Sequence, residues 1–414
     1  MLLSEKLVES APHLLRLTEP QVAEVSRLSR SLIGTADWWG SERDPHDYQP
    51  REVIGIEQRG DHLYKVTVRN AIGALGLPGL DLIVVPKIPM AHFAYIASRA
   101  LIPSERLDVN QVELAGGKGF VSLVAGWFID AMETLLAQGL TRGYHDHSAV
   151  LSVVRGDVDL LSTVSHWLTG RVELDCTYDE FDLDTPINRV LRAASESVAC
   201  SRHVGEEVRS RATRAVRTLS SVGPMRTADA RVRVDRSTFR YDRALELAKQ
   251  VLIGEGRTLM NGSLASGSFL FRTPELMEDG IRNILSSGLN PVRVEKHGRV
   301  LLPSTVRVNP DLEIDTPPFT GDVKYKISGQ GWGRADLAQA VFFATAYRSP
   351  KAIVVSFRDV ASRNLDALKV GIVDVASILW DARESRSPLD SEVELLLAFR
   401  DVLSAAGQRN LTSV

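Results

Sequence analysis

The residues best suited to chemistry lie in one short stretch of this 414-residue chain. Asn309-Pro310-Asp311 is followed by ten residues and then by Asp322-Val323-Lys324. Residues i and i+2 of a strand share a face, so Asp322 and Lys324 are expected to point the same way. Two converging carboxylates repel unless a cation lies between them, and hard oxygen ligands suit Mg²⁺ or Mn²⁺. The stretch predicts a metal site, with Lys324 stabilising a phosphate or holding the attacking water.

Two predicted helices would add further side chains to this site. Pro274 opens a helix that runs to about Ser287 and carries Glu278, a third carboxylate within reach of the same metal. The helix predicted over 334–347 places Asp336, Gln339 and Phe343 on one face. Gln339 is the candidate on that face for a hydrogen bond to the water or for orienting a ligand.

The elements around these residues predict an α/β region with a mixed sheet flanked by helices. Short strands are expected at 292–297, 299–303, 306–314 and 321–327, and further strands at 352–357 and 370–375. Helices are expected before and after the central group. The region from about residue 263 to 414 is therefore predicted to form one domain of this class.

The remainder of the chain predicts two other regions. Residues 1–118 are expected to form a β-rich partner-binding unit, with a helix over 19–33 and strands between 53 and 88. Residues 119–262 are expected to be helical, beginning with a long apolar helix over 119–140. The Gly- and Ser-rich segment 255–268 is the predicted linker.

Composition excludes several classes of protein. The apolar fraction of 44 %, the charged fraction of 24 % and the net charge of −3 are typical of a folded globular protein. No membrane span or secretory signal is expected, and two cysteines favour a reducing cytoplasm. Eleven arginines against five acidic residues between Arg202 and Arg243 indicate either a solvated helical face or a phosphate-facing stripe.

Three other groups of residues could form functional sites, but each also has an ordinary structural explanation. His145-Asp146-His147 suggests a metal site, but it lacks an identifiable third ligand and is expected to be a solvated loop. The four acidic residues of the segment 178–184 are expected to complement the start of a helix at Pro186. Arg155 and Arg171 are expected either to form structural ion pairs or to face a partner or DNA.

The arrangement of a helix Glu, Pro-Asp, Asp-x-Lys and a helix Gln resembles the PD-(D/E)xK nucleases. More specifically, the chain resembles the McrC family, the nuclease subunits of McrBC-type 5-methylcytosine-dependent restriction systems. Asn309, Val323, Ala338 and Phe343 depart from the family pattern, but no carboxylate or lysine is lost. The segments that carry the resemblance are LIVVPKI (82–88), GLTRGY (139–144), VVRGDVDL (153–160), CTYDEFDLDTPINRVLRAA (176–194), FLFRTPELMEDGI (269–281), NPDLEI (309–314), DVKYK (322–326) and DLAQAVFFA (336–344).

The resemblance implies a DNA endonuclease with Asp311, Asp322 and Glu278 as metal ligands and Lys324 and Gln339 as catalytic partners. It also implies a hexameric McrB-like AAA+ GTPase that translocates double-stranded DNA and receives the N-terminal region of this subunit in its ring. The chain itself has no phosphate-binding loop, since AGGKGF (115–120) lacks the Ser or Thr after its lysine. Two alternatives stay open: a non-cutting subunit that stimulates an NTPase ring, and a stand-alone repair nuclease.

Overall fold

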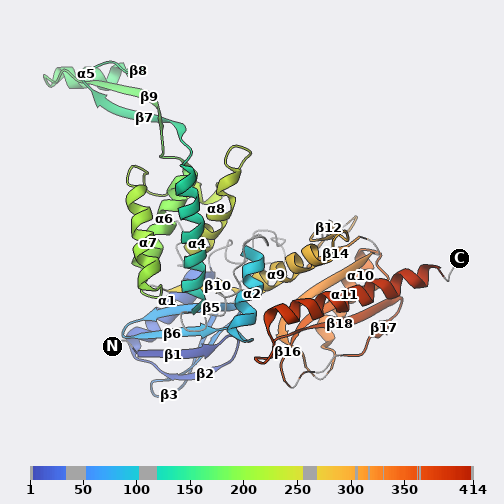
Figure 1. Cartoon of the computed structure of the whole chain (residues 1–414). Coiled ribbons are helices and arrows are strands. Elements are labelled where there is room, and N and C mark those ends of the chain that lie inside the picture. Colours follow the sequence, from blue (N-terminus) through green and yellow to red (C-terminus); the bar gives the residue numbers. More distant parts are fainter. Residues whose placement is uncertain are drawn as a thin grey trace. The chain divides into compact units, whose positions relative to one another are not determined.

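The computed structural model describes residues 3–33, 53–101, 119–254, 268–303, 306–315, 318–329, 331–360, 362 and 365–411 (Figure 1). The chain forms two compact units. One contains residues 1–123, 253–256 and 264–414, and the other contains residues 124–252 and 257–263. The first unit thus holds both the predicted β-rich region and the predicted C-terminal domain. The predicted linker 255–268 lies outside the described residues, apart from Ser268.

Two small sheets and a helix form the N-terminal core of the first unit. Their inward side chains make one apolar cluster that includes Leu7, Val25, Val66 and Leu82. Helix α1 (Glu19–Ile33) has the bounds that its apolar spacing predicts. The first sheet has the strand order β1 (Leu3–Val8), β6 (Leu80–Val85), β5 (Ala71–Leu77) and β10 (Phe269–Arg272). The second sheet has the order β2 (His13–Arg16), β4 (Leu63–Val68) and β3 (Ile54–Gly60).

The C-terminal sheet of the same unit is mixed, as its sequence pattern predicts. Helix α10 (Arg334–Ala346) packs Ala340 and Ala344 on one face of it, while α9 (Thr273–Gly288) and α11 (Pro388–Leu411) contact the sheet and each other (Figure 1). The inner strands β15, β16 and β18 run parallel. The sheet order is β11 (Val294–Glu295), β14 (Leu312–Ile314), β15 (Phe319–Ile327), β16 (Lys351–Arg358), β18 (Val373–Asp381) and β17 (Leu368–Val370).

Two of the predicted strands are wrong in detail. The stretch 306–314 is broken, because β13 (Arg307–Val308) pairs with β12 (Arg299–Val300) in a separate two-stranded ribbon and β14 starts only at Leu312. The stretch 370–375 contains a tight turn at Gly371, whose φ is +62°, so it belongs to the two antiparallel strands β17 and β18. In both places a turn interrupts a run of residues with continuous strand propensity.

The N-terminal and C-terminal parts of the first unit are joined by strand and helix contacts. Strand β10, which leads directly into α9, pairs antiparallel with β5 of the N-terminal sheet. Helix α2 (Met90–Leu101) packs along α9, and Asn283 Nδ2 donates to the carbonyl of Arg99 at 2.9 Å. Buried Glu9 accepts from Thr273 and lies 3.7 Å from Lys87 Nζ. These contacts fix α9, the helix that carries Glu278.

The second unit consists of helices and a sheet-bearing segment, residues 143–182, which we call the arm. Its helices are α4 (Gly119–Gln138), which begins in the first unit, α6 (Pro186–Cys200), α7 (Glu206–Thr218) and α8 (Asp242–Gly254). The 3₁₀ turns η4 (Thr227–Arg231) and η5 (Phe239–Tyr241) precede α8. The arm contains β7 (Gly143–Leu151), β8 (Asp157–Asp159), α5 (Leu160–Leu168) and β9 (Leu174–Asp182).

Arginines of the 202–243 segment are used in part for ion pairs inside this unit. Arg211 Nη2 lies 2.6 Å from both Asp130 and Glu133, which ties α7 to α4. Asp229 of the same segment forms a paired, buried salt bridge with Arg189 of α6, at 2.8 and 2.9 Å. Part of the charge of this segment is thus used in ion pairs within the unit, which neither of the two interpretations of the segment anticipates.

Helix α4 contradicts the expectation that no segment has the length and apolar composition of a membrane span. Residues 120–138 are long and apolar enough to cross a membrane by length and composition alone. Most of that stretch is buried within the protein, which is typical of a core helix.

The close packing of α2 on α9 gives a testable expectation about Gly280. A Cβ added at Gly280 would lie 2.2 Å from the carbonyl oxygen of Ile96, which is backbone and cannot swing away. Gly280→Ala should therefore lower the free energy of unfolding by about 1–3 kcal/mol, as overpacking of a tight interface does. Urea unfolding of both proteins measures the difference.

Gly126→Ala is the matched control, because Gly126 is also helical and a Cβ there would have no neighbour within 4 Å. That change should leave stability the same or raise it slightly, because alanine favours the helix. Equal stability of the Gly280→Ala protein and the wild type would show that α2 and α9 are not held this closely.

Candidate active site

Three carboxylates from three separate elements meet beside strands β14 and β15 of the C-terminal sheet. Glu278 comes from α9, Asp311 directly precedes β14, and Asp322 lies within β15. Asp311 hydrogen-bonds with both of the others. Asp311 and Asp322 are 8 % and 3 % exposed, so the repulsion between the carboxylates is not screened by bulk water. The structure thus brings together all three predicted metal ligands.

Local backbone geometry aims these side chains. Asp311 Oδ2 accepts a hydrogen bond from the N–H of Val323 at 2.9 Å, which joins the start of β14 to the middle of β15. The pairing of β15 with β16 shifts register between Val323 and Ile327. Irregularities of this kind re-aim side chains beside functional sites. Arg282 of α9 donates to the carbonyl of Asp311 at 3.1 Å and fixes α9 against the same turn.

The predicted lysine and glutamine also lie in this group. Lys324 Nζ lies 2.6 Å from Asp322 Oδ2 and donates to Gln339 Oε1 of α10 at 2.9 Å. Asp322 and Lys324 therefore share a face of β15, as the i and i+2 spacing predicts. Asp336, one turn earlier on α10, instead pairs with Lys326.

Lys296 is a member of the cluster that sequence reasoning missed. Its Nζ lies 3.2 Å from Glu278 Oε2 and 3.4 Å from Asp311 Oδ1, between the two carboxylates. Lys296 follows β11 directly, and the segment VRVEKH contains it at the i+2 position from buried Val294. This alternation is the only feature of the sequence that could have pointed to Lys296, and it does not distinguish a site residue because it is common on ordinary strands.

The charges of the cluster are strongly coupled. Burial, together with the charge of Asp311, raises the pKa of Glu278 to about 8 and that of Asp322 to about 7. Burial opposes ionisation of Asp311 as well, but its hydrogen bond with Asp322 and the ammonium of Lys296 lower its pKa. Burial likewise disfavours the Lys296 ammonium, yet Glu278 and Asp311 raise its pKa. Without a metal, these shifts favour ionisation of Asp311 over ionisation of Glu278 and Asp322.

The donor set fits a divalent metal with a preference for oxygen. Asp322 Oδ2 is buried and, among the described residues, makes an ion pair with Lys324 but no hydrogen bond of good geometry. Carboxylate oxygens that converge from three side chains are ligands that Mg²⁺ and Mn²⁺ take. A bound cation would offset the repulsion that raises the pKa of Glu278 and of Asp322.

These shifts predict how stability depends on pH. An acid whose pKa is raised in the folded state binds a proton that the unfolded chain has released. Its contribution to stability is therefore present below about pH 4 and is lost as pH rises through about 7 for Asp322 and about 8 for Glu278. Metal-free wild type should accordingly lose more stability between pH 5.5 and 8.5 than Glu278→Gln, measured by urea unfolding in chelator.

The comparison isolates the carboxyl group, because Gln keeps the volume of Glu and all other titrating groups are shared. An equal loss of stability in the two proteins over this range would contradict the raised pKa of Glu278. Added Mg²⁺ should restore more stability to the wild type at pH 8.5 than at pH 5.5, since the metal competes with fewer protons at the higher pH.

Comparison with solved structures shows the same fold in another protein. A chain of the refined half-complex from a tetradecameric assembly of Thermococcus gammatolerans McrB AAA+ hexamers with bound McrC aligns with a TM-score of 0.61. The alignment has 13 % identity and covers 96 % of this chain and 100 % of that one. A chain of the Thermococcus gammatolerans McrBC complex aligns with a TM-score of 0.44 and 16 % identity, over 69 % of this chain and 88 % of that one.

No curated protein matches the chain. The family model for McrBC 5-methylcytosine restriction system components matches residues 66–355. That range covers most of the chain and includes all five predicted site residues, from Glu278 on α9 to Gln339 on α10. The chain therefore belongs to the McrBC family of 5-methylcytosine restriction system components.

Proposed function

We propose that this chain is the DNA-cutting, McrC-like subunit of its restriction system and hydrolyses phosphodiester bonds with Mg²⁺ or Mn²⁺. The observation that carries the proposal is the continuous contact of Glu278, Asp311, Asp322 and Lys324 beside β14 and β15. In this proposal Asp311 and Asp322 hold the metal, and Glu278 completes the site directly or through water. The metal would supply Lewis-acid stabilisation of charge on the phosphate and a more acidic bound water.

The remaining side chains would act around the reacting phosphate. Lys324 is placed to stabilise negative charge that develops on the phosphate or to hold the attacking water. Gln339 accepts from Lys324 and so restricts the direction in which the ammonium points. Lys296 would give up its place between Glu278 and Asp311, at least in part, when a cation enters.

The partner proposed for this chain is an McrB-like AAA+ GTPase ring that acts on double-stranded DNA. The assembly from Thermococcus gammatolerans contains McrB AAA+ hexamers with bound McrC, and the present chain shares the fold of a chain from it over nearly its whole length. A cytoplasmic location fits this role, because the DNA substrate lies there.

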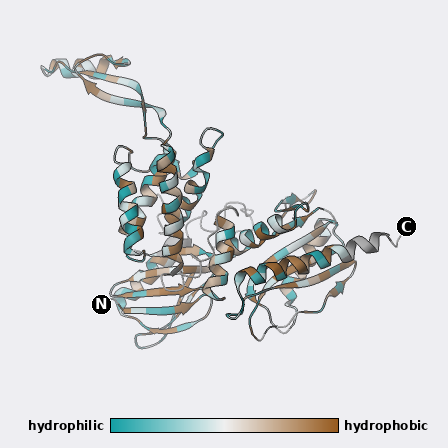
Figure 2. Cartoon of the chain, viewed as in Figure 1, coloured by the Kyte–Doolittle hydropathy of each residue, from teal (hydrophilic) through white to brown (hydrophobic). Residues whose placement is uncertain are grey.

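The arm is the proposed contact with that ring. Large apolar side chains are strongly exposed along it, and Figure 2 shows apolar and polar residues interleaved over its strands and helix. Leu161 and Leu168 on α5 are 84 % and 83 % exposed. Exposed apolar surface on this scale is typical of an interface. The other members are Tyr144, Val150, Val153, Val154, Leu160, Val164, Trp167, Val172 and Phe181.

Replacement of one carboxylate tests the nuclease proposal. Asp322→Asn should reduce cleavage of methylated plasmid by at least about 100-fold, because it removes a metal ligand and the charge that Lys324 faces. The assay combines the chain with its AAA+ partner, nucleotide and Mg²⁺. Asp315→Asn is the control, since Asp315 is an exposed residue just after β14 and should leave cleavage unchanged.

The same assay separates the alternatives. Cleavage by wild type without the partner would indicate a stand-alone nuclease. Absence of cleavage by any protein, with partner NTP turnover stimulated equally by all, would indicate a non-cutting regulatory subunit. Undiminished cleavage by Asp322→Asn would refute the assigned metal site.

Charged substitutions on α5 test the arm as the partner contact. The double change Leu161→Glu and Leu168→Glu should weaken binding to the AAA+ partner by at least about tenfold, because apolar contact is lost and two charges are introduced. Light scattering or calorimetry on the intact proteins measures the affinity. Val360→Glu, at a residue of the other unit that is 88 % exposed, should not change it. Equal affinity of all three proteins would exclude this face of α5 from the interface.

A further inference from the structure

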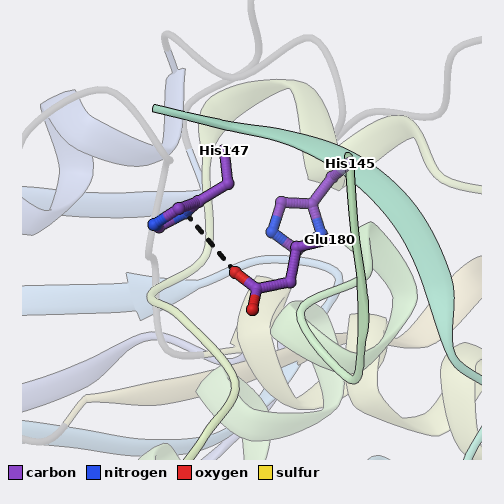
Figure 3. Close-up of side chains that lie close together, drawn as sticks. All are labelled: His145, His147 and Glu180. Carbon is purple, nitrogen blue, oxygen red and sulfur yellow. Dashed lines mark ion pairs between the residues drawn. The ribbon is translucent and has the colours of Figure 1, made fainter. Parts of the chain in front are cut away.

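Two histidines and a glutamate converge on one face of the arm (Figure 3). His145 and His147 are i and i+2 on β7, so their side chains leave the strand on the same side. Glu180 on β9 lies directly opposite His145 in the antiparallel register. The strand pairing therefore supplies the third ligand that the sequence alone did not identify. These residues form a paired strand, so the predicted solvated loop is wrong.

The donor atoms lie near the separation that a metal requires. One ligand atom from each side chain lies within 4.8 Å of the other two. His147 Nδ1 is 3.8 Å from Glu180 Oε2. Donors around a tetrahedral ion with bonds of about 2.1 Å are about 3.4 Å apart. Small rotamer changes would close the site, and the partial exposure of all three side chains gives an ion access from solvent.

Asp182 adds a second, independent feature of a metal site. Its Oδ1 lies 3.4 Å from Nδ1 of His145 and is itself held by the N–H of Asp184 at 2.7 Å. Histidines that ligate metals usually engage a carboxylate with their other ring nitrogen, which fixes the ring and its tautomer. Asp182 thus leaves the Nε2 atom of His145 for a ligand.

The surroundings of the site also favour a cation. Tyr178 packs against His147 with ring centroids 5.3 Å apart, and the guanidinium of Arg155 lies over the Tyr178 ring, 3.7 Å from its centroid. The arginine is thereby engaged with an aromatic face, while Glu180 and Asp182 contribute two negative charges. Imidazole nitrogens with one carboxylate suit Zn²⁺ and its first-row neighbours, whereas Mg²⁺ and Ca²⁺ prefer oxygen alone.

A bound metal ion would stabilise the arm, because the arm has little buried core. Throughout residues 143–182, all of which the structure describes, only Thr163 and Cys176 are buried. A small sheet with so little core has few apolar contacts to stabilise it, and small scaffolds of this kind commonly rely on a metal or a covalent cross-link. The strands are joined by the β7–β9 ladder and by partly exposed side-chain contacts such as Tyr144 with Phe181, whose ring centroids lie 4.7 Å apart.

We propose that His145, His147 and Glu180 bind a Zn²⁺-class ion that fastens β7 to β9, with a water in the fourth position. The site is separate from the carboxylate cluster of the C-terminal sheet and uses a different donor set. It does not depend on the nuclease activity, so either proposal can fail without the other. Its expected effect is to order the arm.

Zinc titration of the full chain tests the site. The titration uses protein without a histidine tag, in an Asp322→Asn background that removes a proposed ligand from the carboxylate cluster. Calorimetry should show binding of about one Zn²⁺ per chain, weakened at least about tenfold by His147→Asn or Glu180→Gln. Asp146→Asn is the control: Asp146 lies between the histidines but faces the opposite side of β7, so its loss should not change the affinity.

Hydrogen exchange gives a readout that does not depend on affinity. Zn²⁺ should slow amide exchange in β7 and β9 of the wild type and of Asp146→Asn, but not of His147→Asn. Co²⁺ in place of Zn²⁺ should give a visible absorption band that Glu180→Gln weakens. Affinity that is the same in all variants would mean an adventitious ion only, and absence of both binding and protection in the wild type would overturn the proposal.

Discussion

Repulsion among three closely packed carboxylates governs the arrangement of the whole site. Asp311 and Asp322 are buried and Glu278 is partly buried, so the three groups cannot all ionise readily without added positive charge. The fold therefore supplies two lysines, one from the turn after β11 and one from β15. It also fixes α9 through β10 and through the close crossing with α2. A divalent cation would complete this balance of charge.

Much of the candidate site is encoded locally and was therefore predictable. Asp322 and Lys324 share a face because side chains alternate between the two faces of a strand. Glu278 lies on a helix that is predicted from the proline at its start and from the spacing of its apolar residues. Lys296 was missed because its place depends on the path of the chain between β11 and β14, which no local pattern specifies. The pairing of β10 with β5, across nearly two hundred residues of sequence, was invisible for the same reason.

In the arm, too, contacts between distant parts of the sequence could not be predicted from local patterns. His145 and His147 carry the spacing of a strand, but a third ligand could be found only once β9 was placed opposite β7. The acidic residues of 178–184 were expected to serve a helix start. Three of them instead lie within β9, and Thr185 caps α6 with its own hydroxyl. Cross-strand register assigns partners to such side chains, and sequence spacing within one strand does not contain that information.

Anomalous scattering from a crystal grown with Mn²⁺ would show directly whether the carboxylate cluster is a metal site. We expect one strong peak bounded by Asp311 and Asp322, with Glu278 at or near it and Lys296 moved away from Asp311. A wild-type crystal with ordered carboxylates, no peak at this position and Lys296 still between Glu278 and Asp311 would contradict it. The result does not depend on the partner ring, on nucleotide or on the DNA sequence recognised.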